Sequence, residues 1–182
     1  GERPEIILAD AADPVSISAM VAQTRAVLTT VGPYQTYGEP LLAACAEQGV
    51  HYVDLCGEPA WMRQMIDRYE AAAKASGACL VFSCGFDSIP FDLGIWFLQQ
   101  AAIARFGKPL TQVRGRVIKM KGTFSGGTAA SLKATMAAAA DPAIMTLLKD
   151  PFALTPDFEG PRQPSGSTPV FDQDLDSWAA PF

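Results

Sequence analysis

The chain has 182 residues, of which 49% are hydrophobic and 18% are charged, and its formal net charge at pH 7 is −5. This composition is too apolar for a disordered chain, and it lacks the basic balance of a nucleic-acid-binding protein. No apolar stretch of about 18 residues runs uninterrupted, so we expect no transmembrane segment. The spacing of the four cysteines does not resemble a zinc site, and we expect buried, reduced thiols in a cytoplasmic protein.

Strands and helices alternate through the first half of the chain. Short apolar runs predict strands at residues 5–9, 26–31, 51–55 and 79–83. Helical periodicity predicts three helices. The first starts after Asp13, the second runs from near Gly38 to Gly49, and the third runs from Pro59 to Gly77. This alternation indicates βαβ units, and therefore a parallel sheet with helices on both faces.

The second half of the chain has a different pattern. An almost uniformly apolar segment predicts a helix at residues 88–106, buried on more than one side. Alternating apolar and polar residues then predict an antiparallel, half-exposed strand at 110–121. Helices are expected at 125–140 and 141–150, followed by a long loop rich in Pro and Gly at about 151–169. We therefore divide the chain into an α/β domain at 1–107 and part of a second α/β (α+β) domain at 108–182.

Ligands of open parallel sheets bind outside the carboxyl ends of the strands, so the residues that follow each predicted strand are candidate site residues. The first strand leads into Asp10 and Asp13. The next three lead into loops in which glycine stands beside a polar or aromatic group, namely Gly32-Pro33-Tyr34, Gly57-Glu58 and Gly85-Phe86-Asp87. A single glycine of this kind is as often required only by a turn as by a binding site, but three of them at one edge of the sheet favour a binding site.

Tyr34 and Asp87 are the candidates for proton transfer. The alternative for Tyr34 is packing at the rim of the site, and the alternative for Glu58 and Asp87, which could form a carboxylate pair, is capping of the helices that follow them. The single histidine, His51, opens an apolar strand, so we expect neither a catalytic triad nor a metal site. Residues 125–128 could bind an anion at a helix N-terminus or serve as a helix cap.

Three ordered motifs resemble the saccharopine dehydrogenase-like oxidoreductases, most closely the branch of trans-acting enoyl reductases. The motifs lie at residues 31–41, 51–58 and 83–94, and residues 125–128 with Ser131 also resemble that branch. The resemblance implies a Rossmann-type domain that binds NADP or NAD, followed by a domain for substrate and subunit contacts. It implies that Val31, Gly32, Pro33 and Tyr34 flank the nicotinamide. It also implies that Asp10 and Asp13 lie near the adenine, and that the crevice between substrate and nicotinamide is lined by Gly57, Glu58, Gly85, Phe86 and Asp87.

The chain departs from this family at its start. Family members begin with a strand, a Gly-rich loop and a helix, and no G-x-G-x-x-G motif occurs here. We expect a fragment of an NAD(P)-dependent oxidoreductase whose parent transfers hydride between nicotinamide and a small-molecule or lipid-like substrate, with enoyl reduction in lipid metabolism as one case. The fragment itself is expected to bind NAD(P)H weakly, to be inactive, and to self-associate into a homo-oligomer through an exposed sheet edge. The alternative is a non-catalytic Rossmann-like binding or scaffold protein.

Overall fold

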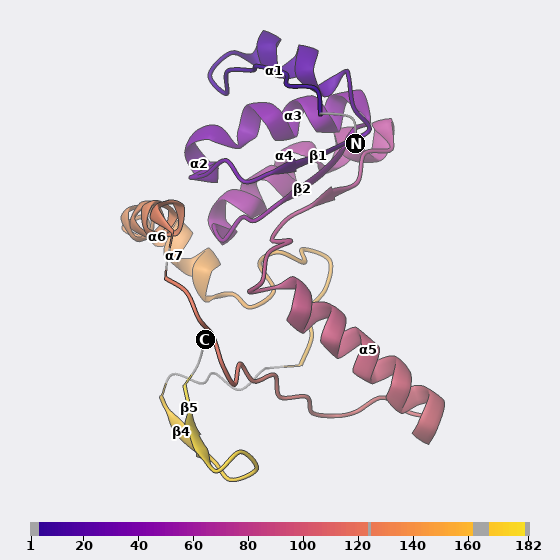
Figure 1. The fold of residues 1–182 in the computed structure, drawn as a ribbon, viewed down its shortest axis with the longest axis vertical. Helices are drawn as coiled ribbons and strands as arrows, with labels where there is room; N and C mark the ends of the chain where they lie inside the picture. The colour runs from indigo at the N-terminus through magenta and orange to yellow at the C-terminus, as the bar shows by residue number, and fades with distance from the viewer. Residues whose placement is uncertain (1–3, 124, 162–167, 181–182) are drawn as a thin grey trace.

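The computed structural model describes residues 4–123, 125–161 and 168–180 (Figure 1). Its helices and strands follow in the order α1 (Pro14–Val21), β1 (Ala26–Thr29), α2 (Tyr34–Tyr37), α3 (Glu39–Gln48), β2 (His51–Asp54), α4 (Pro59–Ser76), β3 (Leu80–Val81), α5 (Ile89–Phe106), α6 (Gly126–Ala138), α7 (Pro142–Lys149), β4 (Val170–Asp172) and β5 (Ser177–Ala179). No helix among these described residues is long and apolar enough to cross a membrane.

The first three strands form a parallel sheet in the order β1-β2-β3. The register pairs Thr29 with Asp54 at the carboxyl ends of β1 and β2, and Val53 with Val81 between β2 and β3. The helices α3 and α4 connect these strands, and α1 packs against α3. The expected α/β fold with a Rossmann-type parallel sheet is therefore confirmed.

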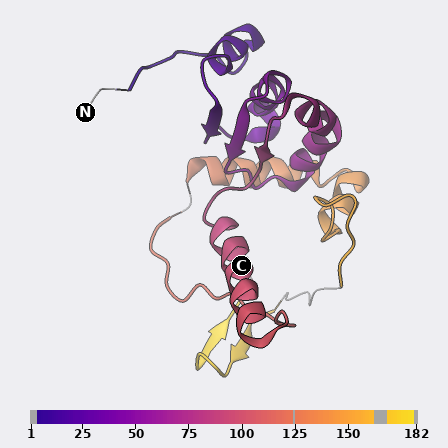
Figure 2. The same cartoon turned by 90° about the vertical axis from the view of Figure 1, so that its right-hand side faces the viewer.

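The hydrophobic core lies on one face of this sheet. Side chains alternate between the two faces of a strand, and Tyr52, which is fully buried, packs in the same core cluster as residues of α1, α3 and α4. The opposite face exposes Leu28 (70%) and Val81 (40%). Figure 2 shows α3 and α4 on one side of the strands. Among the described residues, the expected helices on both faces are found on one face only.

Local signals fix the ends of the three helices that cover the sheet. The Asp13 carboxylate accepts a hydrogen bond from the Val15 N–H at the start of α1, as expected for an N-cap. The helices α3 and α4 begin with proline in their first turn and end at Gly49 and Gly77, whose φ angles are 74° and 81°. Glycine adopts this left-handed conformation without the steric cost of a Cβ atom, so both ends lie where the sequence predicted them.

Two predicted strands are wrong. Residues 5–9 form no strand, and their apolar side chains are exposed, Leu8 by 91%. Residues 110–121 are also irregular. An apolar or alternating pattern becomes a strand only through hydrogen bonds to a neighbouring strand, and no described strand pairs with either segment. The antiparallel pairing of the second half joins β4 to β5 instead, two short strands that the pattern did not reveal.

The helix predicted at residues 88–106 is present as α5, but its predicted burial is wrong. Only Ala102 is buried in this helix, whereas Trp96 is 62% exposed and Phe97 66% exposed. The reason is its position, because α5 points away from the parallel sheet (Figure 1). The helices α6 and α7 confirm the predicted pair at 125–150. The described parts of the predicted 151–169 loop contain no helix or strand, and residues 162–167 lie outside the described residues.

Candidate functional site at the carboxyl edge of the parallel sheet

The loop after β1 is fixed by Tyr34, which is only 5% exposed. Its hydroxyl donates to the Thr29 carbonyl oxygen at 3.2 Å and accepts from the Leu55 N–H at 3.1 Å. These bonds join the ends of β1 and β2, and burial raises the pKa of Tyr34 above its ordinary value. The residue lies in the short helix α2, after a cis Gly32–Pro33 peptide bond, and not in an open loop as the sequence suggested.

Asp54 holds the loops after β2 and β3 together. Its carboxyl group is fully buried and accepts hydrogen bonds from the Cys56 N–H at 2.9 Å, the Ser83 N–H at 2.8 Å and the Tyr52 hydroxyl at 2.8 Å. Burial raises the pKa of Asp54, against the opposing effect of these donors. Sequence reasoning did not select Asp54 as a site residue, although a carboxylate at the end of an apolar strand was the signal.

The turn after β3 has a strained backbone at Ser83. This residue has a φ of 57°, in the left-handed region that residues other than glycine rarely adopt. The strain is held by two bonds, because the Ser83 N–H donates to Asp54 and its hydroxyl donates to the Cys56 carbonyl oxygen at 2.6 Å. Strained residues that the surroundings hold in place concentrate at functional sites.

Glu58 is a buried carboxylate, 2% exposed, that bonds to groups from two other segments. Its Oε1 accepts from the Tyr34 N–H at 2.9 Å and from the Ser131 hydroxyl at 2.7 Å, and its Oε2 accepts from the Gln35 N–H at 2.9 Å. Glu58 occupies the N-cap position of α4, but the capping alternative does not hold for its side chain, which makes no capping bond to that helix. It instead binds the first N–H groups of α2.

The helix α6 lies across the carboxyl edge of the sheet (Figure 2). Its N-cap, Ser125, accepts a hydrogen bond from the Thr128 N–H, so the capping alternative for residues 125–128 is confirmed. Further along the helix, Ser131 reaches Glu58, and a Cβ atom added to Gly32 would lie 3.8 Å from the Ser131 hydroxyl oxygen. A segment distant in sequence therefore closes over the loop that follows β1.

Several candidate residues lie open at this edge. Val31 and Phe86 are 54% and 55% exposed, and Gly57 is exposed with nothing within 4 Å of the place where a Cβ would be. Gly85 lies against Leu55, where an added Cβ would meet that side chain at 3.4 Å. These open positions are where the edge could contact a flat cofactor ring.

The remaining candidates are not gathered at the same place. Asp10 and Asp13 are exposed beside α1, and their carboxylates accept local backbone N–H groups of Ala12 and Val15. Asp87 is exposed and lines a cavity of about 760 Å³. The buried Glu58 does not meet it, so the two form no carboxylate pair in the described structure. The N-cap of α5 is Ser88, not Asp87.

The single histidine makes a structural contact, and the described residues offer no group of side chains that could bind a metal ion. The His51 Nδ1 atom accepts a hydrogen bond from the Cys79 N–H at 3.1 Å, a structural contact between the start of β2 and the residue before β3. No cluster of three or more His, Cys, Asp or Glu side chains that could hold a metal ion occurs among the described residues.

Comparison with known proteins identifies a matching family and relatives of this chain. Residues 1–81 match the family described as the saccharopine dehydrogenase NADP binding domain. A Mycobacterium tuberculosis protein named as a trans-acting enoyl reductase is 46% identical over 84% of this chain and 36% of its own length. Trans-acting enoyl reductases of Mycobacterium bovis and Mycobacterium leprae are 40% and 38% identical, over 91% and 97% of this chain and 40% and 42% of their own lengths.

The chain thus spans 36 to 42% of the length of these curated relatives. No solved structure shows significant similarity to it. The family match covers the parallel sheet from α1 to β3, and the similarity to the reductases continues through α5, α6 and α7. The expected family resemblance and nicotinamide cofactor type are confirmed: residues 1–81 are a saccharopine dehydrogenase-like, NADP-binding type of domain, and most of the chain is similar to trans-acting enoyl reductases.

Proposed function

We propose that the chain is part of an NAD(P)-dependent oxidoreductase and that the nicotinamide lies over the carboxyl edge of β1, β2 and β3. The observation that carries the proposal is the mutual locking of the three loops there. Tyr34 joins the first loop to the second, and Asp54 joins the second to the third. Rigid loops with an open glycine at Gly57 suit a flat ring that must be held at a fixed distance from a substrate.

A bound NADPH would supply the hydride, and the chain's own residues would position the reactants and handle the proton. The hydroxyl proton of Tyr34 is already donated to the Thr29 carbonyl, so we assign Tyr34 a positioning role in place of proton transfer. Asp87 remains the candidate for proton handling, because it is exposed, follows β3 in the sequence and lines the cavity that we assign to the substrate. A general acid or base must reach the reacting atom directly or through one water molecule.

The substrate that we propose is small or lipid-like, with an apolar portion. The cavity beside Asp87 supports this choice, since its large apolar lining residues are Phe91, Val117, Ile118, Met120, Leu175 and Trp178. The relatives are named enoyl reductases, which supports reduction of a carbon–carbon double bond in lipid metabolism as the reaction of the whole protein. In such a step hydride adds to one carbon of the double bond and a proton to the other.

The assembly and location that we propose follow from exposed apolar groups and free thiols. The open sheet face with Leu28 and Val81, together with the exposed side chains of α5, supports a homo-oligomer. All four cysteines are free, which supports a reducing compartment such as the cytoplasm.

A valine at Gly57 tests the location of the cofactor. The space around Gly57 is open, so Gly57→Val in the full-length protein is expected to leave stability unchanged but to weaken NADPH binding about tenfold, or ~1.4 kcal/mol. The control is Gly94→Val, because Gly94 also has open space around it but lies in α5. Equal NADPH affinity in both variants, measured by fluorescence titration, would place the cofactor elsewhere.

Deuterium transfer separates the enzyme from a scaffold protein. The full-length protein, mixed with NADPH deuterated at C4 and an enoyl thioester, is expected to give a product that carries deuterium at the β-carbon, detected by mass spectrometry. Binding of NADPH without such transfer to any enoyl thioester, 2-oxo acid or imine offered would favour the non-catalytic alternative.

A further inference from the structure

The contacts of Glu58 join two parts of the chain that are 73 positions apart in sequence. One oxygen, Oε1, serves both the Tyr34 N–H and the Ser131 hydroxyl. A carboxyl group that is 2% exposed has no water to replace a lost donor, so the loss of one donor disturbs the bonds to the others. The position of α6 is thereby linked to that of α2.

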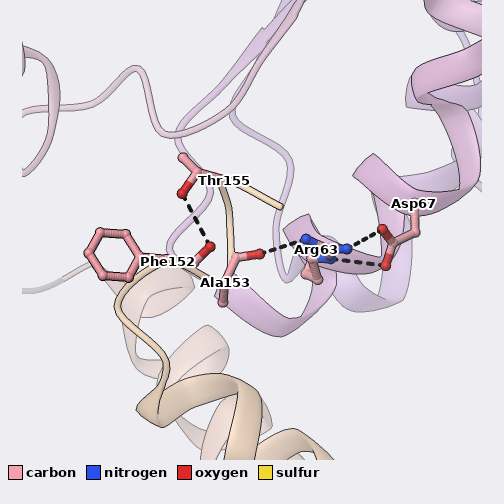
Figure 3. A network of polar contacts seen from close by, with 5 residues as sticks. All are labelled: Arg63, Asp67, Phe152, Ala153 and Thr155. Carbon is pink, nitrogen blue, oxygen red and sulfur yellow. Dashed lines mark hydrogen bonds and ion pairs between the residues drawn. The ribbon is translucent and has the colours of Figure 1, made fainter. Parts of the chain in front are cut away.

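A second polar contact docks the same region on α4. Arg63 binds the Asp67 carboxylate through Nε at 3.0 Å and Nη2 at 2.6 Å, and its Nη1 donates to the Ala153 carbonyl oxygen at 3.0 Å (Figure 3). Ala153 lies just after α7, which contacts α4. The segment from α6 to Ala153 is therefore held at two places, at Arg63 on the outside and at Glu58 beside the candidate site.

The two contacts differ in what they touch. Arg63 binds the turn that follows α7, whereas Ser131 lies against Gly32, in the loop that the proposed nicotinamide site shares with Tyr34. Ser131 is half-buried and Glu58 is fully buried. A displacement of α6 away from Glu58 would break the Ser131 bond and leave Glu58 with the α2 N–H groups alone.

We propose that Ser131 and Glu58 are positioning residues that couple the docking of α6 to the geometry of the loop after β1. The expected effect on turnover rests on the proposed function, whereas the coupling between α6 and the loop after β1 is a property of the fold. With α6 docked, the loop is held in the position that the reaction needs. With the Ser131 bond broken, cofactor can still bind, but the reactants are less well aligned, and small misplacements reduce turnover strongly.

The test compares Ser131→Ala with Ser131→Thr, which keeps the hydroxyl, in the full-length protein. Ser131→Ala is expected to lower kcat about tenfold while the Kd for NADPH changes less than about twofold, and Ser131→Thr is expected to restore most of kcat. Lys133→Ala, at an exposed position of the same helix, is the control and should match the parent protein. A parallel loss of NADPH affinity and kcat without rescue by threonine would overturn the positioning role.

Hydrogen–deuterium exchange makes the test independent of any activity. In the cofactor-free protein, Ser131→Ala is expected to speed exchange of the Tyr34 and Gln35 amides at least about threefold, with the parent rate restored in Ser131→Thr. Unchanged exchange of these amides would overturn the coupling even if the enzyme is active. Faster exchange in a protein that transfers no hydride would support the coupling and remove only the proposed function.

Discussion

Two buried carboxylates organise the carboxyl edge of the sheet. Asp54 and Glu58 are 0% and 2% exposed, and each accepts three hydrogen bonds through its side chain from neighbouring segments. A buried carboxyl group costs free energy unless hydrogen-bond donors surround it, so each group fixes the place of its donors. The loops after β1, β2 and β3 keep their shape through these two side chains.

The raised pKa of Asp54 gives a pH dependence with a definite sign. The Asp54 carboxyl group loses its proton near pH 4 in the unfolded chain but at a higher pH in the folded chain. The contribution of Asp54 to the free energy of unfolding is therefore fully present below about pH 4 and is lost as the pH rises through the raised pKa. Asp54→Asn can keep both N–H acceptor bonds and donate to the Tyr52 hydroxyl. We expect the stability of Asp54→Asn relative to the parent to increase between pH 4 and pH 7 in urea unfolding. A difference that stays constant, or shrinks, with rising pH would contradict the buried carboxyl account.

Removal of the Tyr34 hydroxyl tests its assigned role. Tyr34→Phe loses the bonds to Thr29 and Leu55 and leaves a buried carbonyl group and a partly buried N–H group without their partner, so we expect a loss of about 1–3 kcal/mol in the free energy of unfolding. Tyr37→Phe is the control, because Tyr37 lies in the same short helix with 47% exposure. Loss of turnover at parent stability would instead return Tyr34 to the role of proton donor.

At the scale of elements, alanine substitutions at the glycines that end α3 and α4 separate the cost of a left-handed backbone conformation from the cost of a steric clash. Gly49 and Gly77 both end helices with positive φ, but a Cβ at Gly49 would lie 2.9 Å from the Ser76 carbonyl oxygen, whereas Gly77 has open space. We expect Gly77→Ala to cost about 1 kcal/mol and Gly49→Ala at least about 2 kcal/mol in urea unfolding. Equal costs would show that α3 and the end of α4 separate easily.

Elements with local signals could be predicted from the sequence, and elements that need a distant partner could not. The proline starts and glycine ends of α3 and α4 lie within each helix's own sequence, and their bounds were predicted closely. Residues 5–9 and 110–121 carry strand-like patterns, but a strand also needs a neighbour. The apolar composition of α5 predicts burial, while its exposure depends on what lies beside it.

At the scale of the whole molecule, the strand–helix alternation and three ordered motifs were enough to predict the parallel sheet, its family and the edge that carries the candidate site. The roles of the site residues were not predictable in the same way. Glu58 looked like a cap for its own helix, and its bonds to α2 and to Ser131 depend on the chain returning across the sheet edge. Asp54 was overlooked because its partners are mostly backbone groups of adjacent loops.

The location of the cofactor is the central claim, and hydrogen–deuterium exchange of the full-length protein with and without NADPH tests it most directly. The account predicts that NADPH slows exchange in residues 29–35, 54–58 and 82–87, the three loops at the carboxyl edge, with little change in the β4–β5 hairpin. Slower exchange confined to that hairpin, or no change in the three loops at saturating NADPH, would contradict it.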